Sequence, residues 1–179
     1  MTTPSHPTIT RLESTATIVH AFVSSRVDYC NAVFIRVPKI ITDRLQQVLK
    51  AAARVVSDTQ KFDRGLSRLM HTELHWLDVP ERVQYKLGVL MYQCQHNQAP
   101  QYLPDHCISI SVTVFRQRLR SASSHQVSVP RYRLSTYGHR AFSAAGPTVW
   151  NSLPEDMRDP ECSVHSYRQS LKTFLFSQY

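Results

Sequence analysis

The pattern of apolar and polar residues in the stretch 25–56 predicts a helical hairpin, and the other elements are arranged around it. Residues from about 14 to 33 are apolar nearly all round a helix, which is typical of a central, buried helix. Ser14 or Thr15 is its predicted N-cap, because a side-chain oxygen there can accept from a free backbone N–H. Pro38 then marks the turn of the hairpin.

The second helix of the hairpin is predicted from about residue 39 to residue 56, where apolar residues recur with a 3.6-residue period. The predicted buried face comprises Leu45, Val48, Leu49, Ala52, Val55 and Val56. The opposite face is basic and polar, and comprises Arg44, Gln47, Lys50 and Arg54. The hairpin is therefore expected to have one buried seam and one basic face.

Four more helices are predicted, covering about residues 64–71, 80–96, 140–145 and a last segment capped by Ser163. The first two are joined by an extended linker, 74–80, whose Trp76 and Leu77 are expected to enter the core. Gly146 and Pro147 are expected to end the third helix and begin a turn. The chain is thus expected to be mainly α.

A different rhythm, with a period of two residues, follows His106. The stretches 109–119 and 127–134 alternate in this way, which predicts two short strands or extended segments. Four regions are therefore expected: a disordered N-terminus (1–13), a helical bundle (14–105), an arginine-rich strand or loop segment (106–140), and C-terminal helices packed on the bundle (141–179).

Composition favours a folded protein without a membrane span. Hydrophobic residues make up 42% and charged residues 19% of the chain, as in ordinary globular domains. Mean hydropathy is −0.31, and the absence of an apolar run near 18 residues predicts no transmembrane helix. The first residues lack a signal-peptide pattern, so we expect a cytosolic or nuclear location. The four cysteines contain no CxxC pair, and we expect reduced thiols.

Charge points to a polyanionic partner. The formal net charge is +8, and six of these charges lie between His106 and Pro154, where there is no Asp or Glu. The six cations are Arg116, Arg118, Arg120, Arg131, Arg133 and Arg140. Tyr132 lies between two of them, an arrangement suited to phosphate contact with base or sugar stacking. The alternatives are pairing with nearby carboxylates or simple solvation.

The sequence offers no recognisable catalytic centre. Four glycines cannot form a phosphate-cradling loop, and the acidic residues lack the clustering that a two-metal site requires. A zinc site could be sought in Cys94, His96, His106 and Cys107, but their spacing matches no usual finger. We therefore predict no cofactor, no metal site and no enzymatic activity for this chain alone.

Several blocks in a fixed order carry a resemblance to a known family. They are SRVDYCNAVF, DRLQQVLKAAARVV, LHWLDVPERVQYKLGVLMYQ, APQYLPD, VPRYRLSTYGHRAFSAAGPTVWNSLPEDMR and SYRQSLKTFLF. From about Ile18 to Phe176 the chain resembles the C-terminal region of LINE-type (non-LTR) retrotransposon reverse transcriptases, as in jockey-like mobile elements. That region follows the polymerase palm, and its first helices are similar to the thumb that grips the template–primer duplex.

The resemblance implies that Arg44, Gln47, Lys50 and Arg54 lie on the thumb face and that the arginine segment continues the nucleic-acid track. The family's Tyr-x-Asp-Asp palm motif is absent from this chain, as are its fingers and endonuclease. The expectation is a fragment without polymerase activity that binds RNA or an RNA–DNA duplex. The competing interpretation is a structural remnant or protein-interaction module, which self-associates through apolar surface and binds no nucleic acid.

Overall fold

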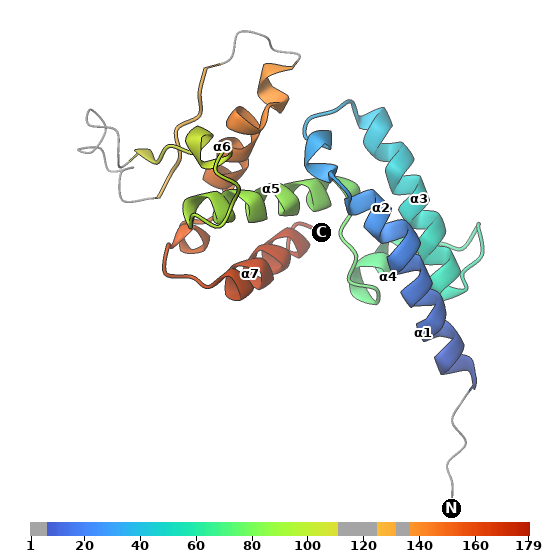
Figure 1. The fold of residues 1–179 in the computed structure, drawn as a ribbon. Helices are drawn as coiled ribbons and strands as arrows, with labels where there is room; N and C mark the ends of the chain where they lie inside the picture. The colour runs from blue at the N-terminus through green and yellow to red at the C-terminus, as the bar shows by residue number, and fades with distance from the viewer. Residues whose placement is uncertain (1–6, 111–124, 132–136) are drawn as a thin grey trace, which may run out of the picture. The chain divides into compact units, whose positions relative to one another are not determined.

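The fold is that of a computed structural model, which describes residues 7–110, 125–131 and 137–179 (Figure 1). These residues are mainly helical, as the sequence predicts. The chain divides into two compact units. The first unit contains residues 1–31 and 38–79, and the second contains residues 32–37 and 80–179.

The first helix begins at Pro7, earlier than the sequence suggests. α1 (Pro7–Val19) continues through a π-helical segment (His20–Ser24) into α2 (Ser25–Asp28). The prediction of a disordered stretch 1–13 is therefore wrong from Pro7 onward, as is the N-cap at Ser14 or Thr15, while residues 1–6 lie outside the described part. Proline suits a first helical turn because its φ is already helical and its missing N–H has no intrahelical acceptor there.

The apolar circumference of this helical stretch is only partly buried, which corrects the prediction of a central helix. Val19 and Val27 are buried. The exposed apolar side chains, with their exposed fractions, are Ile18 (58%), Phe22 (72%) and Tyr29 (75%). α1 and the π-helical segment contact α3 (Lys39–Ser57), and a helix packed against a neighbour on one side buries only the residues on that side.

The turn between the two helical arms lies where the sequence places it. α2 ends at Asp28, and Cys30 has a φ of 51°, in the left-handed region that interrupts a helix. A 3-10 turn (Asn31–Phe34) follows, and Pro38 immediately precedes α3. The hairpin prediction is confirmed, although its first arm ends before Val33.

The buried face of α3 is narrower than predicted. Leu49, Ala52 and Val56 are buried and Leu45 packs against them, in agreement with the prediction. The predicted core residues Val48 and Val55 are instead 49% and 61% exposed. Each follows or precedes a buried residue, and neighbouring helical residues point about 100° apart. Ala53, which the periodicity did not select, is buried in their place.

The remaining core of the first unit comes from α4 (Leu66–Thr72) and the extended linker after it. Met70 of α4 is fully buried, and Trp76 and Leu77 of the linker are buried as predicted. The Gln46 side chain holds the end of the linker to α3, because its Oε1 accepts from Val79 N (2.9 Å) while its Nε2 donates to Asp78. The linker is thus tied to α3 by both packing and hydrogen bonds.

The second unit is organised around α5 (Val79–Gln95), with Pro80 in its first turn, and α7 (Val164–Phe176). Tyr167 of α7 is fully buried, donates its hydroxyl to the carbonyl of Gly88 at 3.0 Å, and stacks on Tyr92. Gly88 has no room for a side chain, since an added Cβ would lie 2.8 Å from Leu171 Cδ2. Ser163 caps α7 as predicted, its Oγ accepting from Ser166 N.

The third helix of this unit, α6 (Phe142–Ser152), runs through Gly146 and Pro147, which corrects the predicted break. The ring of Pro147 would clash with a Cβ on the preceding residue, and Gly146 has none. The helix still lacks the hydrogen bond that an N–H at position 147 would donate to the carbonyl four residues earlier. Trp150, which follows the predicted break, lies on α6 and is buried.

The predicted strands fall largely on residues 111–124 and 132–136, outside the described part. The residues described there form no strand, but one antiparallel bridge joins Ser109 to Val127. Its hydrogen bonds run from Ile110 N to Gln126 O (2.9 Å) and from Ser128 N to Ile108 O (2.8 Å). Residues 108–110 are thus hydrogen-bonded to residues 126–128, on either side of the undescribed stretch 111–124.

Candidate nucleic-acid interface

The first part of the candidate interface is the outward face of α3. Arg44 and Gln47 are exposed, and Lys50 and Arg54 are half-buried. Successive members are three or four residues apart, so their side chains are neighbours along one side of the helix. At about 1.5 Å per residue the stripe spans roughly 15 Å. The four predicted thumb-face residues therefore do share one face.

The three cations of this face are available to an anion. Among the residues that the structure describes, Arg44, Lys50 and Arg54 form no ion pair with a carboxylate. The Nε atom of Arg54 is buried and has no hydrogen-bond partner. An N–H group that is both buried and unpartnered is energetically costly.

The second part of the candidate interface lies in the second unit, and only two of its predicted residues are described. Arg131 is exposed, and Arg140 is half-buried in the 3-10 turn Gly138–Arg140. Neither pairs with a carboxylate among the described residues. The other predicted contacts lie outside the described part, and they are Arg116, Arg118, Arg120, Tyr132 and Arg133.

The base of the arginine-rich segment is fixed by residues that sequence reasoning missed. Asn151 accepts from Val127 N at 2.9 Å and donates to Val127 O at 2.8 Å, so one amide side chain satisfies both backbone groups. Trp150 Nε1 donates to the carbonyl of His125 at 2.9 Å. The stretch that leads to Arg131 is therefore held on α6, although a long-range polar contact of this kind leaves no periodic signal in the sequence.

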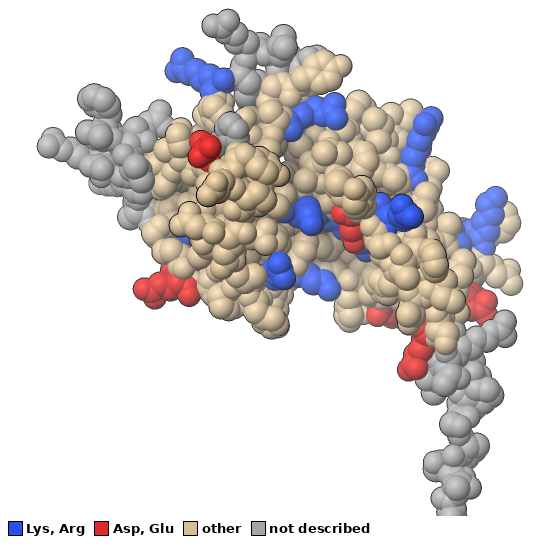
Figure 2. All heavy atoms as spheres, viewed as in Figure 1, with Lys and Arg blue, Asp and Glu red and all other residues tan. Residues whose placement is uncertain are grey.

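On the face that Figure 2 shows, blue Lys and Arg atoms are exposed on several elements, and red Asp and Glu atoms are exposed as well. The basic residues of the candidate interface therefore belong to each unit separately, and they lie on α3 in the first and at Arg131 and Arg140 in the second.

Of the four residues considered for zinc, His96 is held by other contacts, and the side chain of His106 lies outside the described part. The His96 ring stacks on Tyr92 at 3.8 Å between centroids, and its Nδ1 and Nε2 lie 2.8 and 3.0 Å from the carbonyl oxygens of Tyr92 and Pro160. Cys94, on α5, and Cys107, after the 3-10 turn Pro104–His106, are buried. Within the described residues no group of three or more His, Cys, Asp or Glu is arranged to hold a metal ion.

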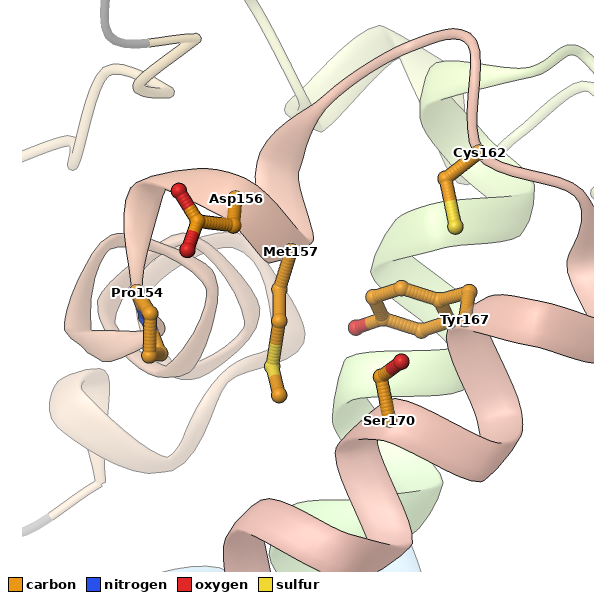
Figure 3. A pocket seen from close by; sticks show the side chains of 6 residues that line it. All are labelled: Pro154, Asp156, Met157, Cys162, Tyr167 and Ser170. Atoms are coloured by element: carbon orange, nitrogen blue, oxygen red, sulfur yellow. The ribbon is translucent and has the colours of Figure 1, made fainter.

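A hollow of about 300 Å³ lies between the C-terminal elements of the second unit (Figure 3). Its lining residues are Pro154, Asp156, Met157, Cys162, Tyr167 and Ser170. The Met157 side chain extends between Pro154 on one side and Tyr167 and Ser170 on the other (Figure 3). Burial raises the pKa of the Tyr167 hydroxyl, which keeps it a neutral hydrogen-bond donor. We assign no chemistry to this hollow.

Comparison with family models, curated proteins and solved structures finds no match to this chain. What the structure establishes is therefore the fold class, a mainly helical protein of two units. Among its described residues no helix has the length and apolar character needed to span a bilayer.

Proposed function

We propose that this chain is a fragment of a LINE-type reverse transcriptase that binds RNA or an RNA–DNA duplex without sequence preference. The observation that carries the proposal is the unpaired basic face of α3, formed by Arg44, Lys50 and Arg54. The order of the sequence blocks and the arginine-rich segment support it. The chain lacks the carboxylate motif of the palm, so the proposed role is binding and excludes polymerisation.

Phosphate contacts give the proposal a measurable magnitude. Each contact with a duplex makes the slope of log K against log salt more negative by about 0.9. Three contacts from α3 predict a slope near −3, and six from the arginine-rich segment would add about −5. Gln47 can donate a hydrogen bond to a phosphate but adds nothing to the slope, because it carries no charge.

The test is fluorescence anisotropy with a labelled RNA–DNA duplex, titrated with the full chain at several salt concentrations. The double variant Arg44→Gln/Lys50→Gln should bind more weakly and make the slope less negative by about 1.8. Arg54 is left unchanged because its guanidinium is partly buried and a substitution there could disturb packing.

A matched control comes from α7, where Arg168 and Lys172 are exposed and lie one turn apart. Arg168→Gln/Lys172→Gln removes the same net charge outside the proposed interface. It should leave the slope unchanged. If the two double variants lose affinity for the duplex equally, the assignment of the interface to α3 is wrong. If the chain shows no salt-dependent binding to the duplex, the proposed function is wrong.

A second candidate, association with another protein chain, is favoured by the exposed apolar residues of the first unit. Phe22 is 72% exposed and Val55 is 61% exposed. Sedimentation velocity over a range of concentrations tests this directly. If association is the function, the sedimentation coefficient of the unsubstituted chain should rise with concentration, and Phe22→Ser/Val55→Ser should abolish this rise. The control Phe62→Ser, at an 88% exposed position before α4, should leave that rise in place.

A further inference from the structure

The apolar surface of α3 is wider than the part that the first unit buries. At about 100° per residue, the side chains that pack inside the unit fill one continuous arc of the helix. They are Leu45, Leu49, Ala52, Ala53 and Val56. Directly beside this arc lie three more apolar side chains, Ile41, Val48 and Val55, whose exposed fractions are 40%, 49% and 61%. We call these three residues the α3 row.

The spacing of the α3 row is that of a helix-packing seam. Its members are seven residues apart, close to two full turns, so they form a nearly straight line about 21 Å long. Arg44 and Ala51, both exposed, each follow a member of the row by three residues. β-branched residues at every seventh position, with a second position three residues later, are the a and d pattern of a helix that packs lengthwise against another helix. The shape of the row therefore fits a helix.

The charge beside the row defines which helix fits. The exposed flank of the row carries Arg44, Gln47 and Arg54. The two arginines form no ion pair with a carboxylate among the described residues. Asp43 of the same helix lies about 140° round from Val48 and so faces away from the row. Carboxylates on the incoming helix are the complement of this flank, since charges beside a seam set the choice of partner.

The same charges disfavour a second copy of the chain in this position. A two-fold contact brings one surface against itself, so the arginines beside the row would meet the arginines of the other copy. The chain also carries a formal net charge of +8, which opposes its close approach to a second copy. An acidic helix from another protein avoids both costs.

We propose that the α3 row binds an amphipathic helix of another protein, which presents heptad-spaced apolar residues to the row and carboxylates to Arg44 and Arg54. Arg44 occupies a d position within the seam, so a carboxylate facing it fixes the register of the two helices. The proposal gives the second candidate function, association with another protein chain, a partner of defined chemistry. It does not depend on nucleic-acid binding.

The test is fluorescence anisotropy of the full chain with three labelled synthetic peptides of about three heptads each. The first has leucine at a and d and glutamate at e and g, and its glutamates keep it from pairing with itself. The second has lysine in place of glutamate, and the third has serine in place of leucine. The chain should bind the first at least about tenfold more tightly than either of the others. Equal binding of the first and third would show attraction by charge alone and would overturn the proposal.

Substitutions on the exposed surface locate the binding site. Val48→Ser/Val55→Ser should weaken binding of the first peptide by about tenfold, because two side chains of the row no longer gain from burial. Phe62→Ser, at an exposed position outside the row, should leave it unchanged. Equal effects of the two variants would overturn the assignment to the row.

A charge reversal tests the acidic character of the partner. Arg44→Glu/Gln47→Glu should move the preference of the chain from the glutamate peptide towards the lysine peptide. Arg168→Glu/Gln169→Glu makes the same change of charge at exposed positions of α7 and should leave the preference as it is. The same shift in both variants would contradict a specific role of the α3 flank.

The outcomes separate this proposal from the others. If sedimentation of the chain alone rises with concentration and Val48→Ser/Val55→Ser abolishes that rise, a second copy fills the row and the proposal is overturned. Failure of the nucleic-acid proposal would appear as the absence of salt-dependent duplex binding, whereas failure of this one would appear as no binding of the glutamate peptide.

Discussion

Asn151 is the residue whose loss should best reveal how the arginine-rich segment is held. Its amide accepts from Val127 N and donates to Val127 O, and Val127 itself has no exposed surface. In Asn151→Ala both backbone groups of Val127 lose their partner. The hydrogen bond from Trp150 to the carbonyl of His125 and the two backbone hydrogen bonds of the Ser109–Val127 bridge are not touched by the substitution.

The expected loss of stability follows from the two backbone groups of Val127 that would lack a hydrogen-bond partner. A buried polar group without a partner costs about 1–3 kcal/mol. Asn151 is only half-buried, so water can enter the space that its side chain leaves, and the lower half of that range applies to each group. The free energy of unfolding should therefore fall by about 2–4 kcal/mol. That is a large fraction of the stability of an ordinary domain.

The assay is urea denaturation combined with hydrogen exchange at the Val127 amide. We expect a lower denaturation midpoint with an unchanged slope, and faster exchange at Val127. Ser152→Ala is the matched control, because its hydroxyl is exposed and, among the described residues, bonds only to Val149 of the same helix. If Asn151→Ala lowers the free energy of unfolding no more than Ser152→Ala does, and hydrogen exchange at the Val127 amide is unchanged, Asn151 does not hold the segment.

Three further predictions concern α5 and α7. Gly88→Ala should destabilise the second unit by about 1–2 kcal/mol in thermal unfolding, because overpacking against Leu171 outweighs a helix-propensity gain of about 1 kcal/mol. Ser163→Ala removes the N-cap of α7 and should lower the free energy of unfolding by about 1 kcal/mol in urea titrations. Above pH 10, the free energy of unfolding should fall by up to about 1.4 kcal/mol per pH unit. Burial raises the pKa of Tyr167 in the folded chain, so the unfolded chain loses this proton first and high pH favours unfolding. In Tyr167→Phe the free energy of unfolding should depend less on pH.

Periodicity and capping were enough to predict α3, α5 and α7. Their buried faces recur every three to four residues, and Ser163 supplies an oxygen at the required position. α1 begins earlier than predicted because it starts at Pro7, and proline is favourable at the first helical position. α6 continues through Pro147, where the sequence predicts a break.

Burial was harder to predict than helicity. An all-apolar stretch such as 14–33 does not say on which side a neighbour will pack, so the exposure of Phe22 could not be deduced from composition. The contacts of Asn151 with Val127 join distant parts of the chain and follow no local period. The candidate interface was predictable only on α3, where helix geometry alone places the cations on one face.

The geometry of α3 also shows how the two proposed functions can be separated. At about 100° per residue, Lys50 and Arg54 lie on one edge of the exposed face, Val48 and Val55 lie on the other, and Arg44 lies between them. A duplex that contacts the basic edge can leave the apolar edge free, so nucleic-acid binding and chain association are not exclusive. Substitutions on one edge should then change one property alone, whereas a change in both would show that the edges act as a single surface.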